Sequence, residues 1–167
     1  TRSAPDGSED TASDRGSALE TSFDVFEPDC VLQPAQVEGP FYFDADQVRT
    51  NIAEDKVGVL LRLQFRVVDA ATCRIIPDAI VDIWHSDAEG LYSGYIGQGD
   101  ERNVDTRGTD FLRGIQVTDA RGRVEFSTIY PGWYPGRTPH IHFKVHLDST
   151  TLITSQVYFS DAVSAAV

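Results

Sequence analysis

The sequence predicts an all-β fold, a β-sandwich of short and mostly antiparallel strands connected by long loops. Two observations lead to this fold class. Short apolar or alternating segments recur along the chain, and Gly, Pro, Asn and Asp residues separate them. The sequence shows neither a convincing amphipathic helix nor an internal repeat. Short strands bounded by turn residues, without helices between them, are typical of sandwiches and barrels.

Alternation locates the first strand. Between residues 59 and 68, Leu61, Leu63, Phe65 and Val67 alternate with polar residues. Because strand side chains point to opposite faces in turn, this pattern indicates a half-buried strand. Further strands are expected at residues 80–84, 111–118, 123–128, 140–147 and 152–159, and a tail of small residues follows at 162–167.

Loop regions interrupt these strands. Residues 69–77 form a turn region, and residues 94–109 form a long loop rich in Gly, Asp, Asn and Thr. Loops of that length in a compact domain are often functional. An aromatic cluster at 39–43 either plugs the core or forms one wall of a pocket. Pro-Gly pairs bracket Tyr134, so its phenol is expected on a constrained loop that leads into the strand at 140–147.

The strand expected at 140–147 carries several polar side chains on one face. His140, His142, Lys144 and His146 alternate with apolar residues that are expected to face the core. The Cα atoms of His140 and His142 should lie about 6.5–7 Å apart, so their imidazoles can converge on one metal ion. His146 lies about 13 Å further along and is a poor candidate for the same ion. The alternative is that the pair is simply solvated.

Composition limits the function classes. A chain of 167 residues forms one domain. We expect that domain at 23–167, after a disordered or linker-like acidic leader at 1–22 that is too polar to bury a core. The net charge of −12 argues against nucleic acid and anionic membranes as partners, because both favour Lys and Arg. No apolar run approaches the ~20 residues that span a bilayer.

The chain contains two cysteines, Cys30 and Cys73, and both flank loops. One disulfide between them is expected, and two unrelated buried thiols are the alternative. A disulfide would place the protein in an oxidising compartment.

Several segments of the chain resemble the intradiol ring-cleavage dioxygenases, the family of catechol 1,2-dioxygenases and protocatechuate 3,4-dioxygenases. The combination is specific because it sets several residue types at fixed spacings. The resemblance extends from about Gly39 to Asp161 and implies a β-sandwich. The matching segments are residues 81–85 with Tyr92, 118–122, 134–142 and 156–159.

By this resemblance, Tyr92, Tyr134, His140 and His142 would hold a mononuclear non-haem Fe(III) ion. Phenolate is a hard anionic donor that also binds iron(III) in catalase. A tyrosine normally titrates near ~10, so only a strongly Lewis-acidic ion keeps two of them ionised at neutral pH. Without the histidines, the two tyrosines would more often line a pocket or the edge of a core.

Further residues match the family's active site. Arg137 would stabilise negative charge on the bound substrate, and a surface arginine is the alternative. Gln156 would hydrogen-bond a ligand or serve as a structural amide. The expected substrate-binding side chains are aromatic: Trp84, Phe41 and Tyr42. Filling of the core is the alternative for Trp84. Two histidines fall outside the pattern and are not expected to be ligands: His85 and His146.

The implied reaction is cleavage of a catechol by O2 between its two hydroxyl-bearing carbons, which gives a cis,cis-muconate. The catechol would lose both protons and chelate Fe(III), while Tyr134 leaves the metal and helps to take up a proton. Two alternatives stay open: a non-catalytic β-sandwich binding module with incidental histidines, and a Zn or Cu enzyme built on His140 and His142.

Departures from the family concern assembly and location. Catechol 1,2-dioxygenases carry a helical dimerisation region where this chain has a polar leader, and the sequence identifies no second subunit. A short, acidic chain with two cysteines resembles the secreted, single-domain branch. We therefore expect an extracellular protein of aromatic-compound catabolism. The end of the chain is compatible with an appended module beyond it, and the oligomeric state stays open.

Overall fold

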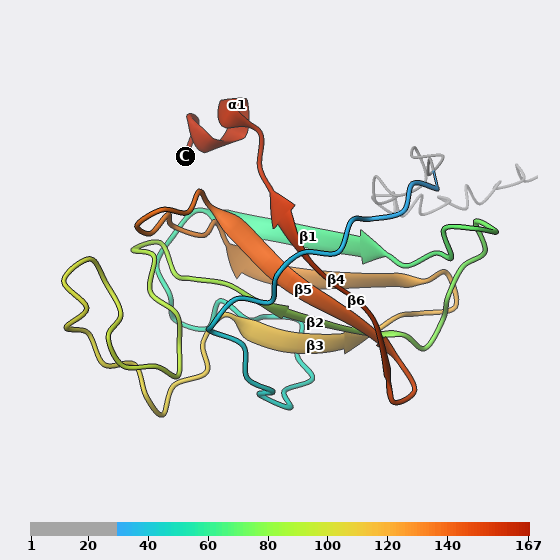
Figure 1. Cartoon of the computed structure of the whole chain (residues 1–167), viewed down its shortest axis with the longest axis horizontal. Coiled ribbons are helices and arrows are strands. Elements are labelled where there is room, and N and C mark those ends of the chain that lie inside the picture. Colours follow the sequence, from blue (N-terminus) through green and yellow to red (C-terminus); the bar gives the residue numbers. More distant parts are fainter. Residues whose placement is uncertain (1–29) are drawn as a thin grey trace, which may run out of the picture.

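The computed structural model describes residues 30–167, and strands dominate this part of the chain (Figure 1). The elements follow in the order β1 (Leu60–Arg66), β2 (Ile80–Trp84), β3 (Arg113–Val117), β4 (Arg123–Ile129), β5 (His140–Leu147), β6 (Thr150–Tyr158) and α1 (Asp161–Ser164). The leader expected at 1–22 and the first residues of the expected domain lie outside the described residues.

The strands form two antiparallel sheets that share one core. One sheet has the order β3-β2-β5-β6 and the other pairs β1 with β4. Buried apolar side chains from both sheets meet in one cluster: Ile52, Ala79, Val81, Ile83, Val124, Phe126, Ile141, Phe143 and Val145. The predicted all-β sandwich is confirmed. Within residues 30–167, no helix has the length and apolarity that a bilayer crossing requires.

The end of the chain differs from the expected tail. Residues Asp161–Ser164 form one helical turn, α1. Ser160 is its N-cap, because its side chain accepts a hydrogen bond from the Val163 amide, and Asp161 lies in the first turn. A serine cap followed by an acidic residue favours a helix start even in a segment of small residues.

Strand β5 is central in its sheet and buried on both faces. Its residues from His140 to Val145 are all buried, although alternate side chains are polar. The chain segment at 30–43 passes across β6 and β5 (Figure 1). It lies on the polar face of β5, because Gly39 packs against the His142 ring and Lys144 Nζ lies over the Tyr42 ring. In this segment, the Gln36 amide donates to the Thr154 carbonyl (2.9 Å), and Glu38 pairs with Lys144 (2.6 Å).

A disulfide joins Cys30 to Cys73, with Cα atoms 5.6 Å apart, as expected. It connects the start of the segment at 30–43 to the turn region at 69–77. The segment that covers β5 is therefore covalently attached to the body of the sandwich at its upstream end.

Candidate metal centre

The pleat of β5 brings two imidazoles together on its covered face. The Nε2 atoms of His140 and His142 lie 3.0 Å apart, and both residues are buried. His140 Nδ1 lies 2.7 Å from the Thr138 carbonyl oxygen, so Nδ1–H donates to it and the Nε2 lone pair faces the other ring. A backbone partner on one ring nitrogen is the usual way in which proteins orient a histidine ligand.

Two phenols from separate loops reach the same point. The Tyr134 hydroxyl lies 3.1 Å from His140 Nε2, and the Tyr92 hydroxyl lies 3.4 Å from that atom. The rings of the two tyrosines meet edge to face with centroids 5.6 Å apart. The structure thus brings together four nitrogen and oxygen donors that the sequence places up to 50 residues apart.

The spacing of these atoms fits one metal ion. Neighbouring ligands that each lie about 2.0–2.2 Å from an ion are themselves separated by about 3 Å. Among residues 30–167, no group of at least three His, Cys, Asp or Glu side chains is arranged to hold a metal. An ion held by His140 and His142 here would therefore use the phenol oxygens, and such hard donors favour a hard cation over Zn or Cu.

The electrostatics of the donors agree with this fit. Burial lowers the pKa of His142 to about 3 and also lowers the pKa of His140, so both imidazoles are neutral near pH 7 and could each offer a lone pair to a metal. Burial raises the pKa of Tyr92, and the nearby Tyr134 raises it further. Tyr92 would accordingly ionise at neutral pH only next to a strong Lewis acid.

His142 is held by stacking. The Trp84 indole lies parallel to its ring, with centroids 4.9 Å apart and 8° between the planes. Trp84 is fully buried, which agrees with the core-filling alternative for this residue. His142 Nδ1 and Trp84 Nε1 are buried, and neither has a hydrogen-bond partner among the described residues.

Two residues of the aromatic cluster at 39–43 contact different parts of the site. Phe41 stacks on Tyr92, with centroids 4.6 Å apart, and meets the Tyr134 ring edge to face at 6.4 Å. Tyr42 instead lies against Trp84 (4.7 Å) and donates its hydroxyl to Asp82 (3.0 Å). Phe41 therefore contacts the two phenols, while Tyr42 contacts Trp84, which in turn stacks on His142.

Arg137 and Gln156 are hydrogen-bonded to each other beside the donors. Arg137 Nη2 donates to Gln156 Oε1 (2.5 Å), which also accepts from the Tyr158 hydroxyl (2.7 Å). The Gln156 amide donates to the Val37 carbonyl (2.8 Å). Gln156 thus connects the arginine to the segment that covers β5.

The two histidines not expected as ligands have hydrogen-bond partners outside the donor group. His85 Nδ1 lies 2.7 Å from the Ser86 carbonyl and Nε2 lies 2.7 Å from the Thr128 hydroxyl, so both ring nitrogens are engaged. Burial lowers the pKa of His85 to about 4. His146 Nδ1 lies 3.0 Å from the Thr151 hydroxyl near the end of β5.

Sequence reasoning missed two buried charges near the site. Asp82 lies in the apolar run of β2 and is 6% exposed, and burial raises its pKa to about 6. Arg113 on β3 is 2% exposed and donates to the carbonyls of Phe41 (2.8 Å) and Ser93 (2.9 Å). A charged residue inside an otherwise buried strand was the available signal for Asp82.

The chain matches the family model described as dioxygenase over residues 33–165. A chlorocatechol 1,2-dioxygenase of Cupriavidus pinatubonensis is 30% identical over 146 residues, which are 74% of this chain and 53% of that protein. A catechol 1,2-dioxygenase of Acinetobacter baylyi is 27% identical over 147 residues, 74% of this chain and 45% of that protein. The chain spans about half the length of the curated relatives it matches.

Solved structures share the fold. An intradiol ring-cleavage dioxygenase from Tetranychus urticae has a TM-score of 0.73 and 40% sequence identity, over 81% of this chain and 68% of that chain. The dioxygenase domain of a dioxygenase carbohydrate-binding protein fusion from Streptomyces sp. SirexAA-E has a TM-score of 0.61 and 32% identity, over 77% of this chain and 75% of that chain.

Proposed function

This chain belongs to the intradiol ring-cleavage dioxygenase family, and we propose that it cleaves catechol-type diols with O2 between the two hydroxyl-bearing carbons. Both oxygen atoms of O2 enter the product, a cis,cis-muconate-type dicarboxylic acid. The observation that carries the proposal is the convergence of the Tyr92 and Tyr134 hydroxyls with the Nε2 atoms of His140 and His142. These four side chains would hold a mononuclear, non-haem Fe(III) ion.

When bound, Fe(III) supplies the Lewis acidity that favours the deprotonated diol and the two phenolates. We assign Tyr134 as the phenol that would accept a diol proton at Oη as substrate binds. It is half-buried on a short loop closed by the backbone bridge between Tyr134 and Arg137. Tyr92 is fully buried and stacked on Phe41, so its side chain would keep its position when substrate binds.

Arg137 would stabilise the negative charge that develops on the substrate oxygens, because its guanidinium is a positively charged donor beside the four side chains. Gln156 would orient that guanidinium through its short hydrogen bond. Phe41 would confine the catechol ring, since it contacts both phenols. Trp84 and Tyr42, expected from the sequence to contact substrate, are better assigned to the support of His142.

We further propose that the protein is extracellular, which the Cys30–Cys73 disulfide supports because disulfides persist in oxidising compartments. The appended module stays a prediction. In its favour, one structural neighbour is the dioxygenase domain of a fusion with a carbohydrate-binding protein.

A visible absorption spectrum tests the proposed function. The iron-loaded protein should show a tyrosinate-to-iron(III) charge-transfer band, and anaerobic catechol should shift the band to longer wavelength. Admission of O2 should then yield one muconate per catechol. An iron-replete protein without colour would contradict the assignment of Tyr92 and Tyr134 and would favour the non-catalytic binding module.

A further inference from the structure

The loops that carry Tyr92 and Tyr134 touch each other at Asp87. The Asp87 carbonyl accepts hydrogen bonds from the Gly90 amide (3.0 Å), on the Tyr92 side, and from the Gly132 amide (2.8 Å), on the Tyr134 side. Ser86 adds a second connection, because its hydroxyl donates to the Gly132 carbonyl (3.1 Å). Backbone groups two residues away from each tyrosine are therefore bonded to one short segment.

Two glycines allow this contact. A Cβ at Gly132 would lie 2.3 Å from the Ala88 carbonyl oxygen, and a Cβ at Gly90 would lie 2.3 Å from the Trp133 carbonyl oxygen. Both neighbours are backbone atoms, which cannot move aside as a flexible side chain can. The two loops thus pack backbone against backbone, and a displacement of one displaces the other.

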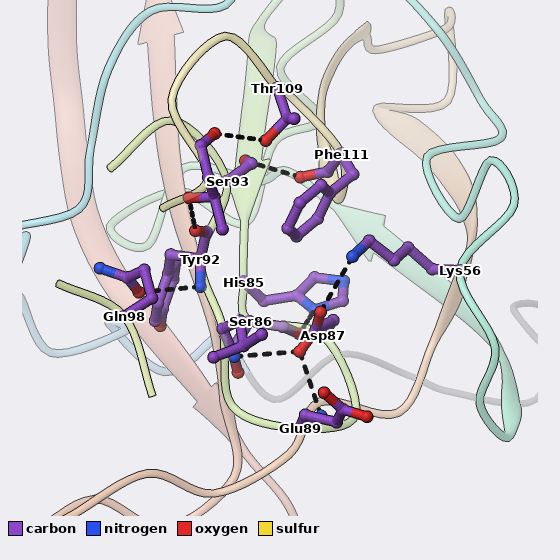
Figure 2. Close-up of polar contacts among 12 residues, drawn as sticks. Lys56, His85, Ser86, Asp87, Glu89, Tyr92, Ser93, Gln98, Thr109 and Phe111 are labelled. Carbon is purple, nitrogen blue, oxygen red and sulfur yellow. Dashed lines mark hydrogen bonds and ion pairs between the residues drawn. The ribbon is translucent and has the colours of Figure 1, made fainter. Parts of the chain in front are cut away.

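The Asp87 carboxylate holds the turn in this geometry (Figure 2). The residue is 6% exposed, and its Oδ1 accepts from the amides of Glu89 (3.1 Å) and Leu91 (3.0 Å). Its Oδ2 accepts from Lys56 Nζ at 3.0 Å. The same ammonium group lies 3.5 Å from the centroid of the Phe111 ring. A nearly buried carboxylate is stable here because each of its oxygens has a charged or amide donor.

We propose that Lys56 and Asp87 form a positioning pair, which sets the spacing of the Tyr92 and Tyr134 phenols before any ion is bound. The pair touches neither phenol and acts through the turn at 87–91 and its contact with Gly132. This inference rests on the proposed function for the identity of the two phenols as metal ligands. Groups that orient metal ligands from outside the coordination sphere typically affect metal affinity about 10–100-fold when they are removed.

The test compares four variants with the wild-type chain. Lys56→Met removes the positive charge and keeps most of the side-chain length. Lys56→Arg keeps the positive charge. Asp87→Asn keeps the acceptor for the turn amides and loses the charge. Arg107→Met is the matched control, because it removes an ion pair with Asp105 that is exposed on the neighbouring loop.

Two readouts separate positioning from simple destabilisation. In the metal-free protein, hydrogen exchange of the Gly90, Leu91 and Gly132 amides should be at least about tenfold faster in Lys56→Met than in the wild type, while exchange in the β1–β4 ladder stays unchanged. In the iron-loaded protein, chelator competition should show about 10–100-fold weaker retention of Fe(III), with a shifted charge-transfer band. Asp87→Asn should resemble Lys56→Met, and Lys56→Arg and Arg107→Met should resemble the wild type.

Unchanged exchange at these three amides in Lys56→Met would overturn the proposal. The proposal would also be overturned if exchange in Lys56→Met became faster while iron retention and band position stayed unchanged. The pair would then have a purely structural role. A wild-type protein that forms no coloured iron complex would instead contradict the proposed function. The exchange measurement on metal-free protein would still decide whether the pair fixes the two loops.

Discussion

The indole of Trp84 lies parallel to the imidazole of His142, 4.9 Å from centroid to centroid. Trp84 ends β2 and His142 lies opposite it in the register of β5, so sheet pairing itself creates the stack. His142 Nδ1 has no hydrogen-bond partner among the described residues. Stacking therefore takes the orienting role that the Thr138 carbonyl plays for His140.

Trp84→Leu should loosen His142 and weaken the metal site. We expect a loss of about 2–4 kcal/mol in the free energy of unfolding, because the indole is fully buried, and about 10–100-fold weaker retention of Fe(III). Urea unfolding of the metal-free protein and chelator competition measure the two effects. Trp133→Leu is the control: Trp133 is 63% exposed, and its loss should change stability by no more than about 0.5 kcal/mol.

Arg137→Gln should lower kcat about 10²–10³-fold, because it removes a fixed positive charge where negative charge develops in the transition state. The charge-transfer band of the iron-loaded protein should stay in place, because Arg137 is not among the four donors. Stopped-flow absorption and product analysis check both points. A lost band with a proportionate loss of iron would show that Arg137 acts on the metal site rather than on the substrate.

Asp82→Asn should remove one component of the pH dependence of stability. Burial raises the pKa of Asp82 from 3.8 to about 6, so the folded protein binds this proton more tightly than the unfolded chain. The resulting stabilisation is complete below about pH 4 and is lost as the pH rises through about 6. We expect this loss, about 2–3 kcal/mol at most, in the wild type and not in Asp82→Asn.

Urea unfolding at pH 4, 5, 6 and 7 measures this difference between the two proteins. Tyr42→Phe serves as a companion, because it removes the hydroxyl that donates to Asp82 while leaving the carboxylate. That hydrogen bond stabilises the ionised carboxylate, so its loss should raise the pKa of Asp82 further. Parallel pH profiles of Asp82→Asn and wild type would refute the expectation.

Loss of the Cys30–Cys73 disulfide should destabilise the protein and loosen the cover of β5. The cysteines are 43 residues apart, and a cross-link of this span typically contributes about 2–4 kcal/mol. The double variant Cys30→Ser with Cys73→Ser should therefore unfold at lower urea concentration. Amide exchange at Gln36, which bonds the Thr154 carbonyl of β6, should rise more than exchange within β5. Equal changes in both places would show a global effect only.

The strands were predictable because their periods are local. Alternation in β1 and in β5 indicates strand structure from a few adjacent residues. The convergence of His140 and His142 was equally predictable, because a strand places every second side chain on one face. The helical turn α1 was missed, because its four residues are too few to show a helical period.

Contacts between segments that are distant in sequence could not be predicted from such local patterns. Arg113 reaches the Phe41 carbonyl across 72 positions of sequence, and Asp87 bonds Gly132 across the gap between two loops. Tyr42 and Phe41 are neighbours in sequence, yet one supports Trp84 and the other stacks on Tyr92. The difference between Phe41 and Tyr42 does not follow from residue type.

The sequence by itself determined the strand pattern, the all-β class and the shared face of His140 and His142, because each depends on residue type and on spacing along one strand. Only the tertiary structure decided that the polar face of β5 is buried, that Trp84 stacks on His142, and that one turn holds the two tyrosine loops together. The physical reason is that burial, and contact between remote segments, depend on where the segment at 30–43 and the loops lie in space. No local periodicity of the sequence encodes these positions.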